Sequence, residues 1–300
     1  GLAIHEGRHM VQFNKLREGQ GKNAWYILFG NFGTAIFTGL YIPPWFLEGD
    51  AVVMETALTR GGRGRLPYFS LWYRGVEMSG ERYSYYRSFL GTYDDNFPYP
   101  SNYSLGYIIC SYVRKHYGRD AWDRIINNTG NYVIFSTFDR SVKTETGKNI
   151  REIYSAAMDE YRSLWTGNLD GIEFTGSTPL SPDHGNTWES YLFPLAYGDE
   201  TLALRFSRKK TLSLVKIKPG GKIVDLKLMP YDLLAPFSAG ERGFSAGGDY
   251  ILWRETKPDP RWGYRSYSNL VLYNISTGDT TDLTRKGKFI ASAISPDGSI

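Results

Sequence analysis

The sequence predicts a multidomain α+β protein in which a mostly helical part is followed by an all-β part. In the first part apolar residues recur at spacings of three and four, as on one face of an α-helix. In the second part they alternate as in strands, between glycine-containing turns. The intervening residues are rich in turn formers and have the composition of a linker. We therefore expect a helical domain over 1–168, a linker over 169–187 and a strand-rich domain over 188–300.

The composition excludes several classes of protein. Hydrophobic residues make up 41% of the 300 residues and charged residues 22%, a balance typical of a folded chain and not of a disordered one. No run of about 18 or more apolar residues is present, so we expect no membrane-spanning helix. The formal net charge of +4 is spread along the chain without a basic block, which argues against a nucleic-acid partner. Cys110 is the single cysteine, so we expect neither an internal disulfide nor a cysteine-ligated zinc site.

Several helices are predicted in the first part. The chain opens directly in a helical pattern, and a further helix is expected around Trp25 to Leu40. Pro43 and Pro44 suit the first turn of a helix that runs to about Leu58. Another helix spans about Tyr103 to Tyr117, with Gly118 placed to end it in a left-handed cap. A last helix carries one apolar stripe, formed by Ile150, Ile153, Tyr154, Ala157, Tyr161 and Leu164.

The second part contains a repeat. Leu202, Ile251 and Ile300 each follow a turn with Gly and Asp and are 49 residues apart (251 − 202 and 300 − 251). The strands predicted at 212–218 and 270–275 each run into a glycine-containing hairpin turn. Several short strands in a repeat of this length are typical of propeller blades, and an antiparallel sandwich is the alternative.

This part resembles the TolB-type, WD40-like propeller family. Repeats of that family carry a Ser-Pro-Asp-Gly turn, found here at Ser295 to Gly298, and a Leu-Tyr hairpin that ends in glycine, found at Leu272 to Gly278. The resemblance implies an incomplete propeller with about two blades and the start of a third. It also implies a periplasmic or exported location, as in envelope-associated bacterial propellers. Because the chain opens in a helix without an initiator Met and ends in an unfinished strand, we expect it to be a fragment.

The strongest indication of chemistry is the HExxH pattern His5-Glu6-Gly7-Arg8-His9 on the first predicted helix. A spacing of four places both imidazoles on one face, where they reach one Zn²⁺ at about 2.0–2.1 Å. Glu6 then lies beside the metal, placed to take a proton from zinc-bound water. Two solvated histidines on a surface helix are the alternative. Gly7 is a poor helix former and indicates close packing of another element against this helix.

A catalytic zinc needs a third protein ligand and an open position for water. Glu48 lies in the first half of a predicted helix whose neighbouring positions are apolar. Burial of its carboxylate is costly unless a cation compensates it, and metal ligation would offset that cost.

At this point the residues resemble a known group of enzymes. The HExxH pattern, followed by Pro-x-Trp-Phe-x-Glu-Gly-x-Ala at Pro43 to Ala51, is similar to the gluzincin metallopeptidases, the group of thermolysin and the zinc aminopeptidases. The resemblance implies a zincin-like catalytic domain that binds one Zn²⁺ and takes a peptide or protein substrate. It implies as zinc ligands His5, His9 and Glu48, and as general base Glu6.

The chain departs from the best-known gluzincins in two respects. Glu48 follows His9 by 39 residues (48 − 9), about twice the usual interval, and the helix expected around Trp25 to Leu40 accounts for the difference. Gluzincins also place a sheet before the HExxH helix, whose edge strand holds the substrate backbone. We expect that part to be missing here.

Peptide hydrolysis also needs a group that stabilises an oxyanion. Tyr103-Ser104-Leu105-Gly106 resembles the Tyr-x-x-Gly element of zinc aminopeptidases, which implies this role for Tyr103. Leu105 stands where that family has lysine, and an ordinary buried aromatic is the alternative. Tyr107 is the nearest competitor for the role.

Three weaker candidates lie close by. Either Asp50 or Glu55 could orient a zinc-bound histidine through its other ring nitrogen, and a capped or solvated carboxylate is the alternative for both. Arg60 to Arg65 reads as a flexible basic loop, either solvated or able to bind a substrate carboxylate.

The predicted function is zinc-dependent hydrolysis of peptide bonds. The alternative from another class is a catalytically inactive cell-envelope scaffold that binds a protein partner through its propeller. A third reading is a zinc-stabilised structural domain, against which Glu6 argues, because a carboxylate beside the metal that is not a ligand has no structural use.

Overall fold

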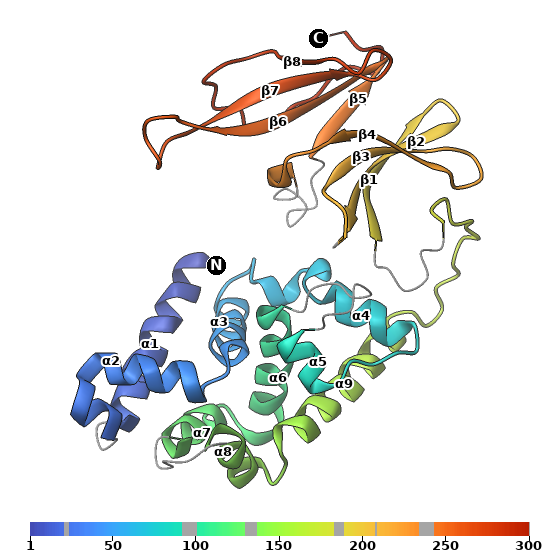
Figure 1. Cartoon of the computed structure of the whole chain (residues 1–300). Helices are drawn as coiled ribbons and strands as arrows, with labels where there is room; N and C mark the ends of the chain where they lie inside the picture. Colours follow the sequence, from blue (N-terminus) through green and yellow to red (C-terminus); the bar gives the residue numbers. More distant parts are fainter. Residues whose placement is uncertain are drawn as a thin grey trace. The chain divides into compact units, whose positions relative to one another are not determined.

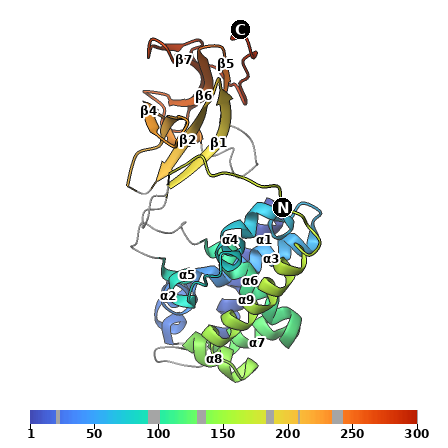
Figure 2. The same cartoon turned by 90° about the vertical axis from the view of Figure 1, so that its right-hand side faces the viewer.

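The computed structural model describes residues 1–20, 24–91, 101–129, 137–182, 189–207, 209–233 and 243–299. Contacts divide this part of the chain into two compact units, the first ending at Phe174 and the second starting at Thr175. The first unit is helical and the second consists of antiparallel sheets (Figures 1 and 2). This confirms the predicted α+β multidomain class.

The described residues of the first unit form nine α-helices and two short 3₁₀ helices. Their bounds are α1 (Leu2–Gln20), α2 (Ala24–Tyr41), α3 (Pro44–Leu58), η1 (Arg63–Arg65), η2 (Pro67–Ser70), α4 (Leu71–Met78), α5 (Tyr85–Leu90), α6 (Asn102–Tyr117), α7 (Ala121–Thr129), α8 (Thr137–Thr146) and α9 (Ile150–Gly167). Each helix predicted from the sequence is present. In the described ranges none of them combines the length and apolar character that crossing a bilayer requires.

Local chemistry explains where several helices begin and end. Helix α3 starts with Pro44 at its first position, where proline lacks an N–H that the helix does not need. Helix α9 starts with a capping box, in which the Asn149 side chain accepts from backbone N–H groups and Glu152 accepts from the Asn149 N–H. Helix α6 is followed by Gly118, whose φ is positive as predicted. Its ψ of 161° lies outside the left-handed helical region that the prediction specified.

The apolar stripe of α9 differs from the prediction at one end. Ile153, Tyr154 and Ala157 are buried, but Leu164 is 56% exposed and Trp165 is buried in its place. Met158 and Trp165 are seven residues apart, about two turns, and both are buried, so the buried face at this end of α9 includes their line. Leu164 likewise follows Ala157 by seven residues, so the apolar spacing alone does not show which of the two lines is covered.

Helices α3 and α6 lie side by side at the centre of the helical unit (Figure 1). They approach at Gly49 and Gly106, where a Cβ on Gly49 would lie 2.6 Å from the carbonyl oxygen of Gly106. Glycine lets two backbones come this close. Aromatic rings next to this crossing fill the core, and Trp45 donates a hydrogen bond to the hydroxyl of Tyr85 at 3.0 Å. The crossing therefore determines the relative positions of the side chains next to these two glycines.

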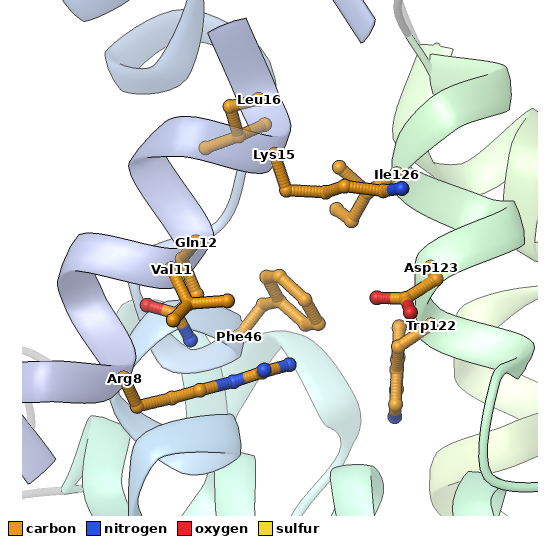
Figure 3. Close-up of a pocket in the computed structure, with 9 residues that line it drawn as sticks. All are labelled: Arg8, Val11, Gln12, Lys15, Leu16, Phe46, Trp122, Asp123 and Ile126. Carbon is orange, nitrogen blue, oxygen red and sulfur yellow. The ribbon is translucent and has the colours of Figure 1, made fainter. Parts of the chain in front are cut away.

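Helix α1 packs against α3 and α7. A cavity of about 110 Å³ lies between these three helices (Figure 3). Its walls are mainly apolar, with polar side chains from α1 and α7; the lining residues are Arg8, Val11, Gln12, Lys15, Leu16, Phe46, Trp122, Asp123 and Ile126.

The second unit contains two four-stranded antiparallel sheets, each with its strands in sequence order. The strands of the first sheet are β1 (Glu189–Tyr197), β2 (Glu200–Ser207), β3 (Ser213–Ile217) and β4 (Ile223–Leu228). Those of the second are β5 (Phe244–Gly247), β6 (Tyr250–Pro258), β7 (Ser266–Asn274) and β8 (Thr280–Asp282). The two sheets contribute to one hydrophobic core, so they pack on each other.

The repeat in the sequence matches equivalent places in the two sheets. Leu202 on β2 and Ile251 on β6 are fully buried in the shared core. Ile300 lies outside the described residues. The turn before it packs against the second sheet, since the Gly248 N–H donates to Pro296 O at 3.0 Å. The identification of the sheets as propeller blades stays a prediction.

Candidate metal centre

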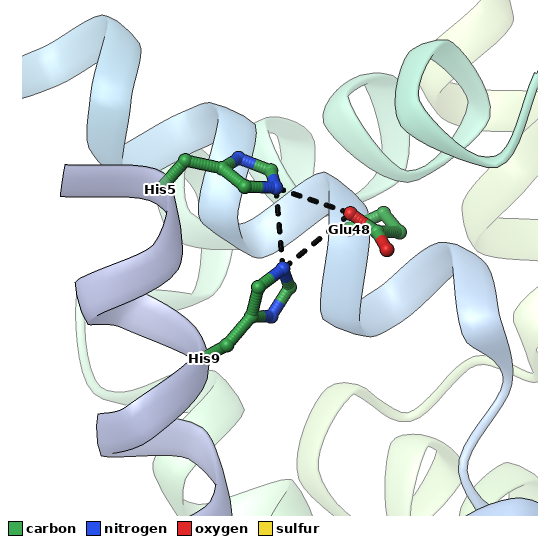
Figure 4. Close-up of side chains that lie close together, drawn as sticks. All are labelled: His5, His9 and Glu48. Atoms are coloured by element: carbon green, nitrogen blue, oxygen red, sulfur yellow. Dashed lines mark hydrogen bonds and ion pairs between the residues drawn. The ribbon is translucent and has the colours of Figure 1, made fainter. Parts of the chain in front are cut away.

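Three metal-binding side chains predicted from the sequence lie together. His5 and His9 project from the same face of α1, and Glu48 faces them from α3 (Figure 4). His5 Nε2 lies 3.2 Å from His9 Nε2 and 3.2 Å from Glu48 Oε2. His9 Nε2 lies 3.5 Å from the same Glu48 oxygen. The three atoms therefore form a nearly equilateral triangle.

The size of this triangle fits a zinc ion. Ligand atoms at about 2.0–2.1 Å from a tetrahedral zinc are about 3.3 Å from one another. The observed separations of 3.2, 3.2 and 3.5 Å agree with that value. Two imidazole nitrogens and one carboxylate oxygen are also a donor set that zinc accepts in catalytic sites. Side-chain exposure rises from 4% at His5 to 18% at His9 and 29% at Glu48, so the donors are not sealed from solvent.

The other ring nitrogen of His5 meets an ion pair. Its Nδ1 lies 3.2 Å from Glu55 Oε2 and 2.8 Å from Arg63 Nη2. A guanidinium only donates, so Nδ1 either donates to Glu55 or accepts from Arg63. Only the first arrangement leaves a lone pair on His5 Nε2 for a metal. Of the two carboxylates predicted to orient a histidine, Glu55 is the one that contacts an imidazole directly.

Glu55 is held as a carboxylate by Arg63. Its Oε1 accepts from the Arg63 backbone N–H at 2.9 Å and from Nε at 2.8 Å, and its Oε2 accepts from Nη2 at 3.0 Å. Burial raises the pKa of Glu55, but these hydrogen bonds and the Arg63 charge outweigh burial and lower the pKa overall. Glu55 is therefore an ionised acceptor beside His5.

Tyr103 lies beside the three donors. It stands one turn before Gly106 on α6, so the close crossing with α3 brings it next to Glu48. Its ring centroid is 5.9 Å from that of His5, and the Arg63 guanidinium lies over its ring at 4.7 Å. Burial raises the pKa of Tyr103, and the negative charge of Glu48 raises it further.

The remaining candidates are placed as follows. Glu6 is exposed on α1, and its charge also raises the pKa of Tyr103. Tyr107 packs against Phe69, with ring centroids 5.8 Å apart, next to the backbone of Gly64. Asp50 is fully buried and pairs with Arg8 and Arg114.

Two expectations about glycine-containing segments are wrong. A Cβ on Gly7 would meet no atom of the described residues within 4 Å, so no element packs against α1 there. The segment predicted as a flexible basic loop is fixed, since Arg63–Arg65 form a 3₁₀ helix. Arg63 pairs with Glu55, and Arg65 donates to backbone carbonyls of α3 and its C-cap. Two of its glycines serve close packing, because a Cβ on Gly62 would overlap the backbone of α3 and a Cβ on Gly64 would overlap the ring of Tyr107.

Two residues of the centre were missed from the sequence. Arg63 was grouped with a solvated loop, although a buried acid such as Glu55 needs a cationic partner. Gln12 was not considered, although it follows His9 by three residues on one helix face and its Oε1 lies 2.8 Å from His9 Nδ1. A search for polar residues three or four positions after the second histidine would have found it.

The chain matches no protein-family model, no curated protein and no solved structure in the three comparisons. Its function is therefore inferred from the residues and geometry of this centre.

Proposed function

We propose that this chain binds one zinc ion through His5, His9 and Glu48 and hydrolyses peptide bonds at that centre. The observation that carries the proposal is the triangle of donor atoms, whose sides of 3.2–3.5 Å suit tetrahedral zinc. The HExxH pattern and its resemblance to gluzincins support the choice of reaction. The Glu48 side chain is 29% exposed, which supports access of a peptide to the metal centre.

The chemistry divides among the residues around the donors. Zinc supplies Lewis acidity, which polarises a carbonyl group and makes water a stronger acid. The Glu6 carboxylate accepts a proton from the attacking water as its oxygen bonds to the carbonyl carbon. Glu6 then passes this proton to the leaving amine as the carbon–nitrogen bond breaks. The Tyr103 hydroxyl donates a hydrogen bond to the oxyanion that forms between these two events.

Stoichiometry of bound metal tests the proposal directly. Elemental analysis is expected to find about one zinc per chain in the wild type and none in His5→Ala or Glu48→Ala. His116→Ala is the matched control, because His116 is a surface histidine that bonds Glu160 at 2.6 Å. Glu6→Gln is expected to keep the zinc and lose hydrolysis of a peptide library. A wild-type chain without zinc contradicts the proposal.

The resemblance to envelope propellers extends the proposal to the strand-rich unit. We propose a periplasmic or exported location, with this unit binding the substrate or a partner protein. Fractionation of cells that express the tagged full-length protein tests the location, and recovery in the cytoplasm alone would contradict it.

A further inference from the structure

The side-chain amide of Gln12 uses all of its hydrogen-bonding groups. Its Nε2 donates to the backbone carbonyl of Leu47 at 3.0 Å and to Asp50 Oδ2 at 2.9 Å. Its Oε1 faces His9 Nδ1 at 2.8 Å. An amide has two N–H donors, so both are committed to α3 and only the oxygen is left for the histidine. Gln12 thus connects α1 to α3 through Leu47 and Asp50, and its third partner, His9, lies on its own helix.

These partners determine the orientation of the amide. A backbone carbonyl and an ionised carboxylate are both pure acceptors, so the amide nitrogen must face them. A flipped amide would place its oxygen against two acceptors and its N–H groups against His9. The oxygen therefore faces His9, and His9 Nδ1 must carry the proton that it donates. In a neutral imidazole the other nitrogen, Nε2, then carries a lone pair, and this nitrogen points at His5 and Glu48.

Asp50 is held as a pure acceptor by two arginines. Arg8 Nε donates to its Oδ2 at 2.7 Å, and Arg114 Nη2 donates to its Oδ1 at 2.6 Å. The Asp50 side chain is fully buried, and two cations around one buried carboxylate keep it ionised. Three elements thus meet at one carboxylate, since Arg8 comes from α1 and Arg114 from α6.

We propose that Gln12 and Asp50 are positioning residues for the metal centre, which hold His9 as the tautomer with its Nε2 lone pair directed at the metal. The proposal rests on the proposed zinc site. Under this proposal the two histidines are oriented by different groups. The neutral amide of Gln12 holds His9, whereas the Glu55 carboxylate lies beside His5. Orientation of a ligand through its second nitrogen is worth about 10–100-fold in metal affinity.

The test must separate positioning from a merely structural bond between helices. Gln12→Leu removes all three hydrogen bonds at similar volume, and the adjoining cavity of about 110 Å³ gives the branched side chain room (Figure 3). Glu77→Gln is the matched structural control. Glu77 is likewise a buried carboxylate, bonded to Arg82 at 2.8 and 2.7 Å, but it contacts none of the three donors in the described residues.

Zinc affinity is measured by competition with a chromophoric chelator on the whole chain, with folding checked by circular dichroism. Gln12→Leu is expected to lower the affinity about 10–100-fold. Glu77→Gln is expected to lower the melting temperature and leave the affinity unchanged. Equal zinc affinity in folded Gln12→Leu and the wild type would overturn the proposal.

A spectroscopic measurement keeps the proposal testable if Gln12→Leu fails to fold. ¹⁵N chemical shifts of the imidazole nitrogens report the tautomer in the metal-free wild type, with His9 assigned through His9→Gln. A protonated Nδ1 on His9 is expected, and a protonated Nε2 would overturn the proposal. If the wild type shows protonated Nδ1 yet binds no zinc, the tautomer assignment holds and only the proposed function fails.

Discussion

The backbones of Gly49 on α3 and Gly106 on α6 are in contact, and each glycine lies close in sequence to a residue of the candidate centre. A Cβ on Gly106 would lie 2.7 Å from Gly49 Cα and would overlap the backbone carbonyl of Trp45. Glu48 precedes the first glycine, and Tyr103 lies one turn before the second. The two glycines of the sequence motifs thus serve one function, which is to bring the helix with Glu48 against the helix with Tyr103.

The first prediction concerns this crossing. Gly106→Ala is expected to force α3 and α6 apart and to destabilise the fold by at least about 1–3 kcal/mol, the usual cost of overpacking. Because Glu48 moves with α3, the variant is expected also to lose zinc. Urea unfolding and elemental analysis measure the two effects.

Gly7→Ala is the matched control for that substitution. Gly7 is helical and has open space around its Cα among the described residues. Alanine is therefore expected to stabilise α1 by up to about 1 kcal/mol and to leave zinc binding unchanged. If both variants behave alike, the crossing does not position Glu48.

Some of this arrangement could be predicted from the sequence because its causes are local. Proline at the start of α3 and the Asn149 to Glu152 capping box of α9 act within a few residues. The four-residue spacing of His5 and His9 likewise determines that both face the same way. In the second unit the glycines after β3 and β7 mark the predicted hairpin turns, and Gly220 and Gly278 both have positive φ.

Other parts could not be predicted because their causes are distant in sequence. The contact between Gln12 and Asp50 is one such part, since only the packing of α1 on α3 brings their side chains to 2.9 Å. Arg63 was misjudged because glycines usually indicate a flexible loop, whereas here Gly62 permits close contact with α3. Leu164 shares the face of Ala157 yet is exposed, so the spacing of apolar residues could not locate the buried face at this end of α9.

The second prediction concerns the support of His5. Glu55→Gln is expected to lower zinc affinity by about 10–100-fold, because the neutral amide is a weaker acceptor for His5 Nδ1–H and leaves Arg63 without its carboxylate. Chelator competition measures the change. Glu160→Gln is the control, since Glu160 forms a surface ion pair with Lys115. This variant is expected to leave zinc affinity unchanged. Unchanged affinity in Glu55→Gln would show that Arg63, and not Glu55, determines the state of His5.

The third prediction concerns stability at high pH. Burial raises the pKa of Tyr85 and of Tyr154 to about 12, above the value of about 10 for an exposed tyrosine. A raised pKa in the folded state means that stability is fully present below pH 10 and is lost as the pH rises through about 12. We expect each residue to contribute roughly 2–3 kcal/mol to this loss.

Urea unfolding at pH 8 and pH 11.5 checks the alkaline loss. Tyr154→Phe is expected to be less stable than the wild type at pH 8, because Ser88 and the Tyr83 carbonyl lose a partner. Its further loss between the two pH values is expected to be smaller than that of the wild type. Tyr86→Phe is the control, since Tyr86 is 54% exposed. An equal alkaline loss in wild type and Tyr154→Phe would contradict the assignment.

The fourth prediction concerns the shared core of the two sheets. Leu202 and Ile251 occupy equivalent repeat positions and are both fully buried in one cluster. Leu202→Ala and Ile251→Ala are each expected to cost about 2–5 kcal/mol, and each to broaden methyl signals from both sheets. Leu228→Ala is the control, since Leu228 on β4 is 69% exposed. Perturbation confined to the mutated sheet would show that the sheets fold separately.

The fifth prediction links metal binding to stability. A ligand that binds only the folded state stabilises it by about 2.7 kcal/mol at a free concentration 100 times its Kd. Added zinc is therefore expected to raise the melting temperature of the helical unit, and a chelator to reverse the rise. His9→Ala is expected to abolish the effect, because it removes one corner of the triangle of donors, and His116→Ala to retain it. A rise of equal size in His9→Ala would mean that zinc binds elsewhere, and the centre on α1 and α3 would lose its main support.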